Sequence, residues 1–160
     1  MSFKLLDDNL INEIAAAAQN SARRRSLYTF HQDNDDKIHR LLNVIQPDSY
    51  VRPHKHQSPD KVEVMVVLQG KLAMVEFAED GRPASQIILT AKVSPYVLEI
   101  ESNTWHMSIA LEADTAVYIV TEGPWQPATH KIMAPWSPEE QDTVAAQKYL
   151  AGLRQELMLY

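Results

Sequence analysis

The sequence of 160 residues contains no cysteine. This absence excludes a disulfide framework, a zinc site built on thiolates and a thiol nucleophile. Positive charge is also scarce relative to negative charge, because the formal net charge is -6. Such a balance argues against nucleic acid or an anionic membrane as the partner. We therefore expect the protein to work on a small molecule.

Long hydrophobic runs are missing as well. No apolar stretch approaches the length that crosses a bilayer, so no membrane segment is expected. At the start of the chain, Asp7 and Asp8 stand where a signal peptide would need its apolar core. These two observations predict a cytoplasmic protein.

The length fits one domain with a real hydrophobic core. Within it we expect three regions: an N-terminal helix and basic turn over 1–36, a β-barrel over 37–122, and a strap rich in proline and tryptophan followed by a helix over 123–160. About eight short segments with strand patterns, separated by turn signals and without helices between them, favour an antiparallel double-sheet jelly roll or small barrel. These segments are 37–45, 50–56, 62–68, 72–77, 85–89, 97–101, 104–110 and 115–121.

Two helices are expected to flank the strands. Asp7 or Asp8 can cap a helix that runs to about Gln19. Ser137 followed by Pro138 and, at the third helical position, Glu140 forms a capping box, which predicts a second helix from Pro138 to about Leu157. Each helix has an apolar stripe that must be covered, and we predict a homodimer that pairs through strands or through these helices.

Three histidines and one glutamate are the candidate metal ligands. Alternation along a strand places His54 and His56 on one face, two residues apart. A turn at 57–61 then brings the chain back, and the inward set of the next strand begins with Glu63. In the later strand 104–110, His106 shares a face with Thr104.

Three neutral imidazoles and a carboxylate suit a first-row divalent ion such as Fe, Mn, Ni, Zn or Cu. The alternative interpretation of the His-x-His pair is two surface histidines on an exposed strand. The spacing by itself leaves both interpretations open.

The order of these residues resembles the two-motif signature of the cupin superfamily, here His54, His56, Glu63, Gly70 and His106. Several flanking segments are similar to the WbuC family of cupin-fold metalloproteins, which occur in bacterial surface-polysaccharide gene clusters. The similar segments are Ser21–Arg25 with His31, Arg40–Asn43, Tyr50–His56, Gly123–Trp125 and Ala134–Glu140. The resemblance implies a cupin-type jelly roll with one divalent transition metal, Fe, Zn, Mn or Ni, held by the four ligands, and a role in O-antigen or related polysaccharide metabolism.

The sequence leaves the type of activity open. A metal with open positions would serve a sugar isomerase or epimerase, or an oxygenase if it is iron. The alternative is a cupin that binds or senses a sugar without catalysis. A metal-free epimerase would need a histidine base and a tyrosine acid, and Glu63 beside two histidines argues for metal instead.

Three arginines are candidates for binding an anionic ligand. Arg52 shares the predicted strand face of His54 and His56, and Arg23 and Arg25 lie in segments similar to the family. A guanidinium fork suits a phosphate or carboxylate. The alternative interpretations are a structural ion pair for Arg52 and a solvated basic turn for the other two. Tyr50, on the same face, is a candidate proton donor, with packing in the barrel as the favoured interpretation.

Overall fold

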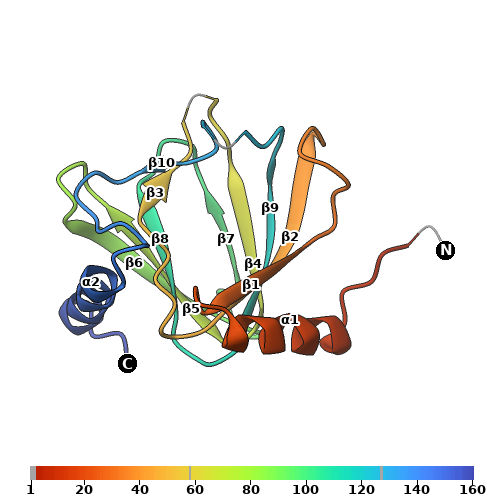
Figure 1. The fold of residues 1–160 in the computed structure, drawn as a ribbon, viewed down its shortest axis with the longest axis horizontal. Helices are drawn as coiled ribbons and strands as arrows, with labels where there is room; N and C mark the ends of the chain where they lie inside the picture. Colours follow the sequence, from red (N-terminus) through yellow and green to blue (C-terminus); the bar gives the residue numbers. More distant parts are fainter. Residues whose placement is uncertain (1–2, 58, 127) are drawn as a thin grey trace.

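The computed structural model describes residues 3–57, 59–126 and 128–160. Within these residues, ten strands form two five-stranded sheets, and one helix lies at each end of the chain (Figure 1). Parts of the predicted turn at 57–61 and of the predicted strap, Ser58 and Pro127, lie outside the described residues, as do Met1 and Ser2.

The first sheet has the strand order β1-β2-β9-β4-β7. Its strands are β1 (Arg25–Thr29), β2 (Ile38–Ile45), β9 (Thr115–Glu122), β4 (Glu63–Gln69) and β7 (Val97–Ile100). The second sheet has the order β10-β3-β8-β5-β6. Its strands are β10 (Ile132–Met133), β3 (His54–Lys55), β8 (His106–Ala110), β5 (Lys71–Phe77) and β6 (Pro83–Thr90). All neighbouring strands are antiparallel, which confirms the predicted double-sheet jelly roll.

Strand alternation separates an inner from an outer face in both sheets. On β8, His106 and Ser108 face the cavity between the sheets, whereas Met107 and Ile109 face the opposite way, into an apolar cluster on the outer face of the second sheet. On β2, Asn43 lines the same inner cavity and Leu42 faces the opposite way. Because successive side chains point to opposite faces, each sheet has an outer apolar surface that needs its own cover.

The helix α1 (Asp8–Asn20) covers the outer face of the first sheet. Asp7 is its N-cap, and the side chain of this residue accepts a hydrogen bond from the backbone N–H of Leu10. The buried stripe of α1 packs on residues of β2 and β9 and on Phe30; it consists of Ile11, Ile14, Ala15 and Ala18. The N-terminal helix predicted from the sequence is therefore confirmed.

The helix α2 (Thr143–Glu156) covers the outer face of the second sheet, where Ala146, Leu150 and Leu153 join the cluster formed by β5 and β8 (Figure 1). The predicted start at Pro138 is wrong, because the N-cap is Asp142. The Ser137 hydroxyl instead donates to the carbonyl of Ala134, and Glu140 pairs with arginines far away in the sequence. The local contact of Ser137 and the long-range pairs of Glu140 occupy the two side chains that a capping box would need.

The basic turn predicted at Arg23–Arg25 is also wrong in part, because β1 begins at Arg25 and pairs with β2 over its whole length. The two sheets thus include β1 and β10, which lie outside the range 37–122 assigned to the barrel.

Both helices bury their apolar stripes against sheets of the same chain. The predicted homodimer would therefore need a different surface, such as the exposed apolar side chains at 87–97. Among the described residues, no helix has the length and apolar content that crossing a bilayer requires.

Candidate metal centre

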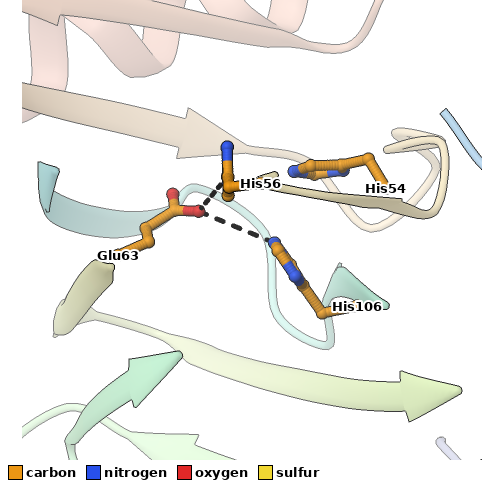
Figure 2. A group of neighbouring side chains, drawn as sticks. All are labelled: His54, His56, Glu63 and His106. Carbon is orange, nitrogen blue, oxygen red and sulfur yellow. Dashed lines mark hydrogen bonds and ion pairs between the residues drawn. The ribbon is translucent and has the colours of Figure 1, made fainter. Parts of the chain in front are cut away.

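Four side chains from three strands converge inside the barrel (Figure 2). His54 comes from β3, Glu63 from the start of β4 and His106 from the start of β8, while His56 directly follows β3. All four are at most 6% exposed. One ligand atom from each lies within 4.8 Å of the ligand atoms of the other three. The sequence therefore identified side chains that the fold brings together.

Each histidine ring is oriented by a backbone carbonyl that accepts from its Nδ1. The Nδ1 of His54 donates to the carbonyl oxygen of Arg52 at 2.9 Å, and that of His106 donates to Thr104 at 2.8 Å. The Nδ1 of His56 donates to His130 at 2.7 Å. Since a carbonyl can only accept, the proton of each neutral ring must sit on Nδ1. The Nε2 lone pairs are left facing the centre of the cluster, as metal-bound histidines require.

The protonation states also suit a cation. Burial, the charge of Lys131 and the neighbouring His106 hold the pKa of His54 well below its usual value, so this ring is neutral. Burial alone would raise the pKa of Glu63, but hydrogen bonds donated by His106 and His56 when their Nε2 atoms carry a proton, together with the charge of Lys131, outweigh that effect and hold it well below the usual value. A neutral imidazole and an ionised carboxylate are the forms that coordinate metal.

Two features of the cluster indicate that a cation is needed. The buried Nε2 atoms of His54 and His106 have no hydrogen-bond partner within the part of the chain that the structure describes. The Oε2 of Glu63 lies 3.0 Å from the Nε2 of His56 and 3.6 Å from that of His106. A carboxylate oxygen facing an imidazole lone pair is repulsive unless a proton or a metal ion lies between them. The four residues thus fit a divalent metal ion.

An open cavity leads to this cluster from the side of the first sheet. A pocket of about 310 Å³ is lined by His56 and Glu63 together with residues of β1, β2 and β9. It adjoins a wider pocket of about 580 Å³ lined by His54 and by Arg23, Arg25 and Arg52. A third pocket of about 40 Å³ lies directly over His54, Glu63 and His106. A ligand of modest size can therefore reach the metal ligands from outside.

His130 and Lys131, which lie just before β10, also line this cavity, although no pattern in the sequence pointed to them. The ring of His130 lies 5.3 Å from that of His56, measured between centroids. Neither residue belongs to a pattern of alternating polarity, and β10 has only two residues, so periodicity offered no signal for them.

The predicted arginines line the outer part of the cavity, and all three are engaged by carboxylates. Arg23 and Arg25 pair with the two oxygens of Glu140 at 2.9 and 2.7 Å. Arg52 pairs with Glu139 at 2.5 Å and also donates to the carbonyl of Ala134. The arginines therefore tie the segment before α2 to the barrel, and they line the cavity at the same time.

Two further residues from the sequence analysis have clear positions. Tyr50 is buried in the apolar cluster around α2, where its hydroxyl donates to the carbonyl of Pro138. His31, which the sequence analysis left outside the ligand set, stacks on His39 at a centroid distance of 4.1 Å and lines the 310 Å³ pocket.

His130 makes the stability of the metal-free protein depend on pH. Burial and the nearby Lys131 lower the pKa of this ring to about 3, whereas an unfolded histidine titrates near 6.5. Below about pH 6.5 the unfolded chain binds a proton that the folded chain does not, so stability is complete above this pH and is lost as the pH falls toward 3. Urea unfolding of chelated protein at pH 7 and pH 5 should show this loss, and His130→Asn should reduce it. An equal loss in the variant would contradict the assignment to His130.

Solved structures with the same fold are distant in sequence. KdgF from Halomonas sp. has 14% identity and a TM-score of 0.51, over 68% of this chain and 87% of that protein. The capsular polysaccharide assembling protein CapF from Staphylococcus aureus has 18% identity and a TM-score of 0.55, over 71% of this chain. The chain spans only 30% of the length of CapF.

A protein from Klebsiella pneumoniae with a double-stranded β-helix domain has 10% identity and a TM-score of 0.56, over 83% of this chain and 98% of that protein. At these identities the likeness establishes the fold alone, which is the cupin-type double-stranded β-helix. No curated protein sequence matches the chain. A family model described as a domain of unknown function, DUF6016, matches residues 6–89, which is more than half of the sequence. The chain is thus a cupin-fold member of the DUF6016 family.

Proposed function

We propose that the protein binds one divalent transition metal, Fe, Zn, Mn or Ni, through His54, His56, Glu63 and His106. The observation that carries this proposal is the convergence of four buried ligand atoms, two of them without hydrogen-bond partners among the described residues, at the inner end of an open cavity. An ion with open coordination positions there would polarise a carbonyl or hydroxyl oxygen of a ligand, or would bind dioxygen if it is iron. The chemistry fits a sugar isomerase or epimerase, or an oxygenase.

We further propose that the ligand is a small anionic sugar derivative. The 310 Å³ pocket lies at the lower end of the range for small-molecule sites, which suits a single sugar unit. Arg23, Arg25 and Arg52 give the outer pocket a positive rim in a protein whose net charge is -6. Such a rim attracts anions toward the cavity, and Arg52 is the rim residue that we propose to contact the charge of the ligand.

The cellular role that we propose is in bacterial surface-polysaccharide metabolism, in the manner of the WbuC family. The segments that resemble this family come together around the cavity. His31, Asn43 and Trp125 line the 310 Å³ pocket, here called the inner pocket, and Glu140 lines the 580 Å³ pocket, here called the outer pocket. The fold likeness to a capsular polysaccharide assembling protein is in accord with this role.

Metal analysis of protein purified without a histidine tag tests the proposal. Wild-type protein from metal-supplemented medium should contain about one divalent ion per chain, as expected for a single site. His106→Ala should lower metal affinity by more than about tenfold, because substitution of residues that only hydrogen-bond to metal ligands already lowers affinity by about that factor. His31→Ala is the matched control, because this histidine lines the cavity but lies outside the ligand set, and it should keep its metal. Metal-free wild-type protein, or full metal content in a folded His106→Ala variant, would refute the proposal.

A further inference from the structure

Lys131 occupies a central place in the cavity beside the proposed metal ligands. In the pairing of β10 with β3, Ile132 lies opposite Lys55 and Met133 opposite His54. The same register places Lys131 opposite His56, immediately before β10. Lys131 and Asn43 line all three pockets around the four-residue cluster, whereas the arginines line only the outer one.

The carboxylates of Glu63 and Glu140 favour the charged form of Lys131, but neither pairs with it directly within the described part of the chain. Its ammonium group forms no ion pair and donates no side-chain hydrogen bond there, in contrast to Arg23, Arg25 and Arg52, which all hold carboxylates. Lys131 is only partly exposed, and burial lowers its pKa. An ammonium group withdrawn from water without a partner is costly, so a structure that keeps one in a cavity favours an anion there.

Asn43 faces the same space from the opposite sheet. It lies on the inner face of β2, and it lines the pocket over His54, Glu63 and His106. An amide offers both a donor and an acceptor, which suits a hydroxyl group. Trp125 closes the pocket on the side of the strap and borders both the inner and the outer pocket.

We propose that Lys131 and Asn43 form an anion subsite next to the metal ligands, in which Lys131 binds the carboxylate or phosphate of a sugar ligand and Asn43 binds a neighbouring hydroxyl. This inference rests on the proposed function and makes it more specific. It assigns most of the charge selectivity of the site to an inner lysine, with Arg52 contacting the same charge from the rim.

Calorimetric titration of the metal-loaded protein tests the subsite with three probes: D-glucuronate, D-glucose 1-phosphate and neutral D-glucose. Wild-type protein should bind at least one of the anionic sugars more tightly than glucose. Lys131→Met, which keeps the length of the side chain and removes its charge, should weaken anionic binding by about tenfold or more, as expected for a hydrogen bond to a charged group. Binding of glucose should not change.

Two further measurements separate the subsite from the metal site and from the rim. Lys131→Met should retain wild-type metal content and should not lower the melting temperature, because the lysine has no direct ion-pair partner among the described residues and its burial as a charged group is costly. Arg52→Ala should weaken anionic binding less than Lys131→Met does. The subsite is refuted if metal-loaded wild-type protein does not prefer either anionic sugar, or if Lys131→Met keeps the preference, including the case where only Arg52→Ala loses it. Absence of metal from wild-type protein would refute the proposed function itself.

Discussion

Removing the metal is expected to lower the melting temperature of the protein by about 10 °C. A ligand present at about a thousand times its dissociation constant stabilises the folded state by about 4 kcal/mol, and each kcal/mol shifts the melting temperature of a chain of this size by about 2–4 °C. The effect has a local cause. Without an ion, the carboxylate of Glu63 and the Nε2 atoms of His56 and His106 lie close together with no cation between them.

The measurement is a thermal melt before and after chelation, followed by return of the metal. The melting temperature of wild-type protein should fall after chelation and return to its first value when metal is added back. Glu63→Gln is the informative control: it keeps the shape of the side chain but removes the charge that binds the cation, so chelation should change its melting temperature little. A wild-type melting temperature that is unchanged by both chelator and added metal would contradict the metal assignment.

The second large effect is expected from Arg25→Ala, which should destabilise the protein by about 3 kcal/mol, in the range measured when one member of a buried ion pair is removed. The Arg25 side chain is only 10% exposed. It donates to Glu140 at 2.7 Å and to the carbonyl of Tyr50 at 2.8 Å. Its loss leaves Arg23 as the remaining ion-pair partner of Glu140 among the described residues and removes the donor to that carbonyl.

Urea unfolding at pH 7 measures this effect, and the same substitution at Arg82 is the matched control. Arg82 pairs with Asp80 at 2.7 Å, but both side chains are largely exposed, so Arg82→Ala should destabilise the protein far less than Arg25→Ala does. Equal effects of the two substitutions would show that the contacts of Arg25 do not stabilise the fold.

The four candidate metal ligands could be found from the sequence because each belongs to a regular strand pattern. Alternation along 104–110 placed His106 on the inner face, and the structure shows His106 and Ser108 inside and Met107 outside. Both histidines of the His-x-His pair point into the cluster although β3 spans only His54 and Lys55. The carbonyl of Arg52 orients the ring of His54, and the carbonyl of His130 orients the ring of His56. Local periodicity was thus enough to predict the jelly roll and to place the candidate ligands on inner faces, whereas the resemblance to the cupin signature was needed to favour a metal site over two surface histidines.

The rest of the cavity depends on contacts between distant segments, which no local pattern encodes. Lys131 enters the site because β10 pairs with β3, and nothing near Lys131 in the sequence predicts that pairing. The capping box at Ser137 failed for the same reason, since Glu140 binds Arg23 and Arg25 more than 100 positions away instead of the start of a helix. Ionic contacts of long range outweighed a local capping preference worth about 1 kcal/mol.

The pairing of β10 with β3 has a consequence for the kinetics of metal exchange. The carbonyl of His130 accepts from the Nδ1 of His56, and the two-residue strand β10 pairs with β3 beside His54 (Figure 1), so the segment that orients one ligand also borders a second. Opening of this short pairing would remove the carbonyl that orients His56, and openings of so few residues are local events that need no global unfolding. Loss of one ligand from the cluster can therefore occur while the rest of the barrel stays folded, so metal exchange should not require unfolding of the protein.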